Sequence, residues 1–327
     1  MAITEGALEI TIISGFYVCV FYHLVFILPR INNFMKKKIA VLFCGLCNIN
    51  PKNIDGIFSA FDKISSDYDV TVDYYMHLWN DENMFPENFD GKRVHGRPDQ
   101  SYYEYLPTED KSLHANVIDN INPKMIVYSN YSDTINNSFY DGTPSYISFV
   151  NTLGQFYAFD KLLNSANYDD YDLIIRWRYD LLVNHHDFSL NMSNALNSLS
   201  PNVKYFASKD THIIGGGHGK YGNNDRWFGI TPNLIQDFNS LHKKMYVETK
   251  KESHMGDYTY VEEAFLNIIT AANPNRVSVQ FIERVIRKNM LICENYSSMS
   301  KDEQDSQLNG ISIWVGPEHA NNGYTPD

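Results

Sequence analysis

Two arginines and a carboxylate follow a short apolar run near the middle of the chain. Leu173 to Trp177 has the apolar, β-branched composition of a buried strand, and Arg176, Arg178 and Asp180 alternate with aromatic residues at its end. Alternate side chains of an extended backbone point to one face, so the three charged groups are expected to share a face. Together they could bind a phosphorylated ligand and, through Asp180, a divalent cation. A structural Arg–Asp pair in the protein interior would explain the same residues.

A C-x-x-C spacing occurs at the exit of the first predicted strand. Cys44 and Cys47 have the spacing of a redox motif or of half a zinc site, but the other two cysteines, Cys19 and Cys293, form no second pair. Small residues in a tight turn from strand to loop explain Cys44 and the following Gly45 better than redox or metal chemistry.

Composition and charge exclude several classes of protein. The chain has 327 residues, of which 43% are hydrophobic and 20% charged, and this is typical of a globular protein with a sizeable core. Its net charge of −12 argues against a general nucleic-acid-binding protein, because phosphate contacts need clustered Lys and Arg. A phosphate site in this chain must therefore be a local positive pocket.

The N-terminal segment has two interpretations. Residues 10–28 form an apolar run of membrane-spanning length, preceded by two glutamates and followed by Arg30 and three lysines. In the first interpretation, residues 10–28 anchor the chain in a membrane, and the charge bias places the globular body in the cytoplasm. Alternatively, residues 1–34 are an annotation extension, and the chain starts at Met35 in front of a strand. Both interpretations predict a cytoplasmic body.

Alternating strand and helix patterns predict a doubly wound α/β sheet. Ile39 to Cys44 and Met125 to Ser129 read as buried strands, and Tyr68 to Met76 as a strand between them. The spacing over Ile54 to Ile64 predicts a crossover helix, and another helix is expected over 110–121. Three such steps imply a nucleotide-binding sheet with ligands at the carboxyl ends of its strands.

The second half is less regular. A helix is predicted over 145–167, strands over 203–207 and 277–281, and helices near 231–245 and 258–272. His185, His186 and Asp187 resemble a metal cluster in composition, but adjacent strand residues point to opposite faces, so they are interpreted as loop residues. The tail from Ser297 is polar and is predicted to be loose.

Several short motifs, in this order, resemble one known family. They are the run Lys38 to Gly45, His77-x-Trp79, Gln155-Phe-Tyr157, Tyr171 to Asp180 with its Arg-x-Arg-x-Asp, the pair Asn224-Asp225, and Glu262-Glu263. The order resembles that of bacterial and phage-borne glycosyltransferase-like proteins of the GT-A fold, found among surface-polysaccharide biosynthesis genes. The resemblance covers roughly residues 36–290. It implies an α/β, GT-A-like fold with a Rossmann-type, mostly parallel central sheet flanked by helices.

Composition and the resemblance together divide the chain into segments. Residues 1–34 form the hydrophobic N-terminal segment, and residues 35–296 form the glycosyltransferase domain. Within that domain, residues 35–183 are the nucleotide-sugar-binding half and 184–296 the acceptor half, and residues 297–327 are a polar tail.

The resemblance assigns Asp180 the role of the acid that binds Mn²⁺ or Mg²⁺ on the donor diphosphate. A hard cation that neutralises a leaving diphosphate suits carboxylate oxygens. Arg178 stands where GT-A enzymes have the first acid of Asp-x-Asp, so a metal-independent mode is open, in which Arg176 and Arg178 stabilise the diphosphate directly.

Further residues are assigned to donor binding and to catalysis. Cys44 and Gly45 are placed in the donor site, and His77 and Trp79 are candidates for contact with the nucleotide base. Alternatively, His77 is hydrogen-bonded and Trp79 packs to close the sheet edge. The catalytic candidates form a separate set: Asp225, which faces the active site in the family, and Glu262 and Glu263, either of which could be the general base of an inverting transfer. The two glutamates could equally be favourable charges at a helix N-terminus.

The leading hypothesis is a glycosyltransferase that moves a sugar from a nucleoside-diphosphate sugar to a hydroxyl of a glycan or glycolipid, with no nucleic-acid partner. One alternative is a GT-A domain that has lost catalysis and serves as a glycan- or protein-binding module. Another is an α/β enzyme resembling nucleotidyltransferases, which would have a similar sheet.

Overall fold

The computed structural model describes residues 36–47, 49, 51–80, 110–130, 147–179, 181–198, 203–209, 227–249, 268, 277–282, 286–287 and 295–310. Contacts divide the chain into two units, residues 1–37 and 38–327, and the fold below is that of the second unit. In the described part of the chain, no helix combines the length and the apolar character needed to cross a membrane. The apolar run at 10–28 lies outside the described residues.

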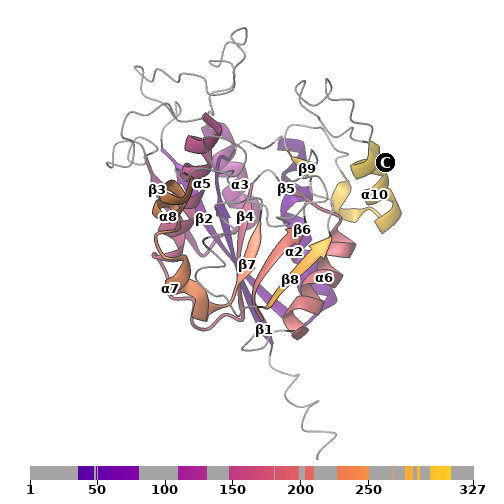
Figure 1. The fold of residues 1–327 in the computed structure, drawn as a ribbon. Coiled ribbons are helices and arrows are strands. Elements are labelled where there is room, and N and C mark those ends of the chain that lie inside the picture. Colours follow the sequence, from indigo (N-terminus) through magenta and orange to yellow (C-terminus); the bar gives the residue numbers. More distant parts are fainter. Residues whose placement is uncertain are drawn as a thin grey trace, which may run out of the picture. The chain divides into compact units, whose positions relative to one another are not determined.

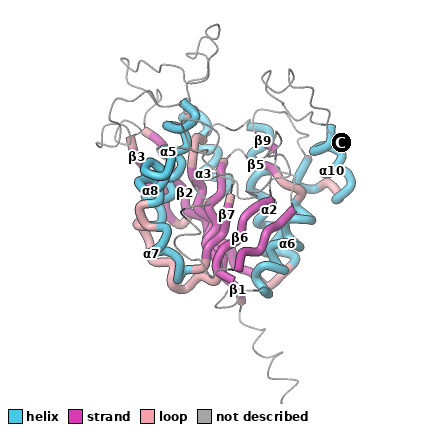
Figure 2. Tube along the Cα trace, viewed as in Figure 1, coloured by secondary structure: helices cyan, strands magenta, loops and turns pink. Residues whose placement is uncertain are grey.

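The described strands form one large sheet and one small one (Figures 1 and 2). The large sheet has seven strands in the order β3-β2-β1-β4-β7-β6-β8, and β5 pairs with β9 in the small sheet. Their bounds are β1 (Lys37–Cys44), β2 (Val70–Trp79), β3 (Met125–Ser129), β4 (Leu173–Arg178), β5 (Leu181–Leu182), β6 (Val203–Lys209), β7 (Phe228–Ile230), β8 (Val277–Ile282) and β9 (Ile286–Arg287).

One strand, β7, interrupts the parallel order of the large sheet. The pairs β1–β4, β2–β3 and β6–β8 are parallel, whereas β7 is antiparallel to both β4 and β6. The predicted fold class is therefore confirmed as α/β, with a mostly parallel central sheet flanked by helices.

Helices cover both faces of the large sheet. The described α-helices are α2 (Ile54–Asp67), α3 (His114–Ile121), α5 (Ile147–Leu163), α6 (His185–Ser198), α7 (Ile235–Phe238), α8 (Leu241–Thr249) and α10 (Lys301–Gly310). Short 3₁₀ helices are η2 (Pro51–Asn53), η4 (Lys111–Leu113), η5 (Pro232–Leu234) and η6 (Tyr296–Ser298). Figure 1 shows α2 and α6 on one side of the strands and α5, α7 and α8 on the other.

The alternation of side chains along β1 creates two cores. Ile39, Val41 and Phe43 join a cluster with α2, α3 and α6, while Leu42 and Cys44 join a cluster with α5 and α8. Each strand side chain thus buries its apolar surface against a helix layer, and such burial is the main source of stability. The buried positions of α2, which follow the predicted helical spacing, confirm the crossover helix.

Three predictions of local structure need correction. β2 continues beyond Met76 to Trp79, because Tyr75 to Trp79 pair with β3. His185 to Asp187 are not loop residues but the first turn of α6. The tail after Ser297 is not loose as far as Gly310, since η6 and α10 bury Tyr296, Gln304 and Leu308. Of the helix predicted near 258–272, only residue 268 lies in the described part, and it is helical.

Candidate functional site

The order of the strands reverses between β1 and β4. From β1 the chain passes through α2 to β2 and then to β3, on one side of β1, whereas β4 lies on its other side. At the carboxyl end of this parallel pair, Cys44 and Arg178 are Cα partners. Ligands of open α/β sheets bind in the crevice at such a switch point, outside the carboxyl ends of the strands. The sequence prediction of a site after β4 therefore coincides with the place that the topology favours.

Gly45 makes the turn at the end of β1. Its φ of +107° lies in a region that residues with a Cβ rarely adopt. A Cβ added to Gly45 would meet Gln155 Cγ at 3.6 Å, an ordinary contact distance. The backbone conformation, and not a lack of space, therefore requires glycine at this position.

Replacing Gly45 with Ala should lower the free energy of unfolding by about 1–3 kcal/mol, because alanine must adopt a strained φ. Urea unfolding followed by far-UV circular dichroism measures this difference. An unchanged unfolding midpoint would show that the turn relaxes to another conformation without cost.

Arg176 lies inside the protein, on the α5 face of the sheet. Its side chain has no exposed surface, and its Nη2 donates a hydrogen bond to Gln155 Oε1 at 2.7 Å. The guanidinium carbon lies 5.1 Å from the centroid of the Phe156 ring and 5.8 Å from that of Phe228. Stacking on aromatic rings is a favourable environment for a guanidinium group. The sequence left two roles open, direct contact with the diphosphate and a structural role in the interior. This environment supports the structural role, in which Arg176 acts as a brace for the strand end.

Arg178 is the more accessible of the two arginines. It lies two residues further along β4 and is only partly buried, at the carboxyl end of the strand.

The neighbouring Cys44 thiol is buried and donates a hydrogen bond to the carbonyl of Leu42 at 3.2 Å. Burial raises the pKa of this thiol to about 12, partly opposed by the charge of Arg176, so Cys44 stays a neutral thiol at physiological pH.

Tyr179 fixes the chain directly after Arg178. Its side chain is buried, its hydroxyl donates a hydrogen bond to the carbonyl of His77 at 2.8 Å, and its ring stacks on Phe43 with centroids 5.5 Å apart. The next residue, Asp180, lies outside the described residues. Within the described ranges, no group of three or more His, Cys, Asp or Glu side chains is placed to hold a metal ion.

His77 and Trp79 are buried residues of β2, and Trp79 packs against α5. Their ring centroids lie 4.5 Å apart, and Trp79 stacks on Tyr157 with centroids 6.0 Å apart. The ring nitrogens of His77 have no hydrogen-bond partner among the described residues. Burial, assisted by the charge of Lys161, lowers the pKa of His77 to about 3, so the ring is neutral.

A buried carboxylate on α5 has a structural role that the sequence analysis missed. Asp160 accepts hydrogen bonds from the backbone amides of Leu241, at 2.9 Å, and His242, at 3.0 Å, and it also bonds Nδ1 of His242. It thereby caps the N-terminus of α8, where free amides and the helix dipole favour a negative charge. In the sequence, the sign of such a role was the position of Asp160 within the mostly apolar stretch from Phe156 to Leu163, because a buried carboxylate needs hydrogen-bond partners.

The remaining predicted site residues cannot be placed. Asp225, Glu262 and Glu263, the three proposed catalytic residues, lie outside the described residues, as does Asp180. Of the donor-site residues, the structure brings together Cys44, Gly45, Arg176 and Arg178 at the ends of β1 and β4. His77 and Trp79 lie on the neighbouring strand β2, in the interior.

Comparisons with known proteins give similarities of structure alone. No family model and no curated protein sequence matches the chain. A glycosyltransferase involved in glycosylation of the major capsid of PBCV-1 is similar with a TM-score of 0.37 and 8% identity, over 84% of this chain and 99% of that one.

The glycosyltransferase GlyE of Streptococcus pneumoniae TIGR4 is similar in two structures. Its apo form has a TM-score of 0.36 and 11% identity, over 75% of this chain, and the second has a TM-score of 0.35 and 10% identity, also over 75%. The matched part is 45% and 46% of the two GlyE chains, so this chain spans less than half their length. These three similarities do not establish a family for the chain.

Proposed function

We propose that the chain is a glycosyltransferase that uses a nucleoside-diphosphate sugar and transfers the sugar to a hydroxyl of a glycan or glycolipid. The observation that carries the proposal is the switch point between β1 and β4, where a glycine turn and a partly accessible arginine meet across parallel strands. An anionic ligand that approaches this edge finds the Arg178 guanidinium and a backbone without a Cβ at Gly45.

The two arginines have different roles in this proposal. Arg178 contacts the donor diphosphate, because a guanidinium group suits paired phosphate oxygens and stabilises the charge that develops on the leaving diphosphate. Arg176, stacked in the interior, adds positive charge below the site and holds Gln155 beside Gly45. His77 and Trp79 are buried side chains of β2, so in this proposal they pack in the interior and do not contact the nucleotide base.

A divalent cation, Mn²⁺ or Mg²⁺, would be held by the Asp180 carboxylate together with oxygen ligands that the substrate supplies. Mg²⁺ is commonly bound by one or two carboxylates together with substrate phosphates and water, so a single acid suffices. When bound, the cation would neutralise negative charge on the diphosphate. Asp225 and either Glu262 or Glu263 are the proposed catalytic residues, with a glutamate as general base for the acceptor hydroxyl.

A donor screen tests this proposal. Thermal shifts and release of nucleoside phosphates are measured with UDP-, GDP-, CMP- and dTDP-sugars in the presence of Mn²⁺. Arg178→Met should weaken donor binding about 10- to 100-fold, because it removes charged hydrogen bonds. Asp180→Asn should abolish release that depends on Mn²⁺. Lys244→Met, which removes an exposed cation on α8, is the matched control and should change neither.

The screen also separates the alternatives. A module that has lost catalysis would show donor-dependent thermal shifts without release of a nucleoside phosphate. A nucleotidyltransferase would instead release pyrophosphate from a nucleoside triphosphate. A wild-type chain that shows neither binding nor release with any donor would contradict the proposed function.

A further inference from the structure

Two buried tyrosines fix the chain that follows Arg178: Tyr179 within this segment and Tyr296 from the C-terminal part of the chain. On the first side, Tyr179 places its ring on Phe43 of β1 and donates its hydroxyl to the carbonyl of His77 on β2, at 2.8 Å. Tyr179, which follows Arg178, is therefore fixed to the adjacent strand β1 and to β2, the strand beyond it. The hydroxyl of Tyr179 bonds a backbone carbonyl and not a rotatable side chain, so this bond fixes Tyr179 relative to the backbone of β2.

On the second side, the C-terminal segment holds the chain from Leu181 onward. Leu181 and Leu182 pair with β9, and the hydroxyl of Tyr296 donates to the carbonyl of Val183 at 3.0 Å. Tyr296 is buried, and its ring lies against Gly56 of α2, where an added Cβ would come within 3.2 Å of Cδ1. Burial also raises the pKa of Tyr296, which keeps its hydroxyl protonated and able to donate.

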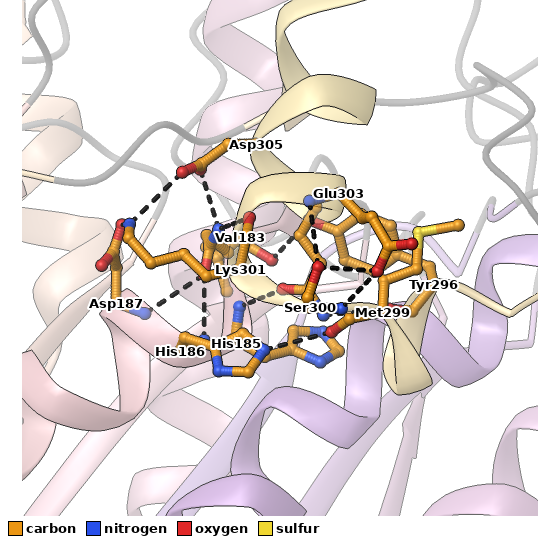
Figure 3. Close-up of polar contacts among 12 residues, drawn as sticks. Val183, His185, His186, Asp187, Tyr296, Met299, Ser300, Lys301, Glu303 and Asp305 are labelled. Atoms are coloured by element: carbon orange, nitrogen blue, oxygen red, sulfur yellow. Dashed lines mark hydrogen bonds and ion pairs between the residues drawn. The ribbon is translucent and has the colours of Figure 1, made fainter.

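Polar contacts extend this attachment into α6 (Figure 3). Asn184 caps α6, since its Oδ1 accepts from the amides of His186, at 2.9 Å, and Asp187, at 3.2 Å. Its Nδ2 donates to the carbonyl of Lys301, at 3.1 Å, and to Asp305 Oδ1, at 2.8 Å. The amide of His185 donates to Gln304 Oε1 at 2.7 Å. In Figure 3, Tyr296, His185 and His186 lie together where α6 begins.

We propose that Tyr179 and Tyr296 are positioning residues for the diphosphate site, an inference that rests on the proposed function. Arg178 directly precedes one held residue, and Asp180 lies in the sequence between Tyr179 and the segment held by Tyr296. Groups that bind a phosphate or a cation work only when held close to the productive geometry, and small displacements cost much of their effect. The C-terminal segment thereby contributes to the donor site by positioning the chain that follows Arg178.

The test compares three substitutions that each remove one buried hydroxyl. Tyr179→Phe and Tyr296→Phe remove the two proposed positioning bonds. Tyr168→Phe is the matched control, because Tyr168 is also buried and its hydroxyl donates to a backbone carbonyl, that of Leu162, at 2.9 Å. All three should lower the melting temperature by similar amounts, since each loses the same kind of bond.

Pyrophosphate binding, measured calorimetrically on the full chain, separates positioning from stability. Tyr179→Phe and Tyr296→Phe should weaken it about 5- to 20-fold, whereas Tyr168→Phe should leave it unchanged. Hydrogen–deuterium exchange should accelerate in peptides covering 178–187 in the first two variants only. Unchanged pyrophosphate affinity in both variants would overturn this inference alone. A wild-type chain that binds neither pyrophosphate nor any nucleoside diphosphate would overturn the proposed function and this inference with it.

Discussion

Arg176→Ala should lower the free energy of unfolding by about 3–5 kcal/mol, because truncating a large buried side chain leaves a cavity and leaves the Gln155 oxygen without its donor. The guanidinium group has no exposed surface and lies between Phe156 and Phe228, with Nη2 bonded to Gln155 Oε1. Alanine would leave the two rings without their packing partner and the amide oxygen without its donor. Chemical unfolding of the wild type and the variant measures the difference.

Arg176→Met separates the two contributions. Methionine keeps most of the packing volume but removes the donor to Gln155, so its cost should be smaller, about 1–3 kcal/mol. Adding Gln155→Leu to Arg176→Met should restore part of the loss, because the oxygen that lost its donor is then removed as well. A loss below about 1 kcal/mol for Arg176→Ala would show that this interior contact contributes little.

The same variants distinguish the roles of the two arginines. If Arg176 acts as a brace, Arg176→Met should keep pyrophosphate binding to a greater extent than Arg178→Met does, despite the larger loss of stability. Equal losses of binding would mean that both guanidinium groups contact the anion. The comparison is informative because the two residues lie two positions apart on one strand and differ mainly in burial.

The parts of the fold that were predictable are those built from apolar periodicity. Ile39 to Cys44 is a continuous apolar run, and Leu173 to Trp177 is apolar except for Arg176. Strands buried under helices on both faces have this composition. The crossover helix after β1 was visible because its apolar residues repeat every three to four positions. Each of these patterns lies within one segment of the sequence, and burial in the folded protein favours the same structure that the local pattern predicts.

The errors occur where polar residues are buried through partners distant in the sequence. His77 looked like a residue at the end of β2, but pairing with β3 carries the strand to Trp79 and buries the ring. The start of α6 depends on Asn184, whose amide bonds α10 more than a hundred residues later. Nothing in the local pattern reveals such a partner, although an Asn followed three residues later by an acid is a signal for a helix start.

The candidate site shows the same division. The charged residues at the end of β4 were visible in the sequence, because such residues after an apolar strand are a local feature. Which arginine is buried was not predictable, since both alternate with aromatic residues in the same way. Arg176 is interior because α5 brings Gln155 and Phe156 over it, whereas Arg178 lies at the strand end.

The second large effect should appear on acidification: between pH 8 and pH 5 the free energy of unfolding should fall by about 4 kcal/mol through His77 and His185, roughly half from each. Burial lowers the pKa of His77 to about 3 and that of His185 to about 4. The charge of Lys161 also lowers the pKa of His77. For His185, the hydrogen bond to the Gly56 carbonyl and the charge of Asp55 raise the pKa, whereas the charges of His186 and Lys63 lower it further.

The sign follows from which state binds protons first. A histidine in the unfolded chain has a pKa of about 6.5, so below that pH the unfolded state takes up protons that the folded state excludes. The stabilisation is therefore complete above about pH 6.5 and is lost progressively as the pH falls toward 4 and then 3. A window from pH 8 to pH 5 is the most informative, because most carboxylates stay ionised there and contribute little to the slope.

His77→Phe tests the contribution of His77 to this pH dependence. Phenylalanine should fit an apolar cluster in which the imidazole nitrogens have no hydrogen-bond partner among the described residues, so the variant should fold. It should lose about half of the pH dependence, while His185→Gln keeps a donor for the Gly56 carbonyl and should lose the other half. An unchanged slope of unfolding free energy against pH in both variants would mean that acid lability comes from carboxylates and not from these two buried rings.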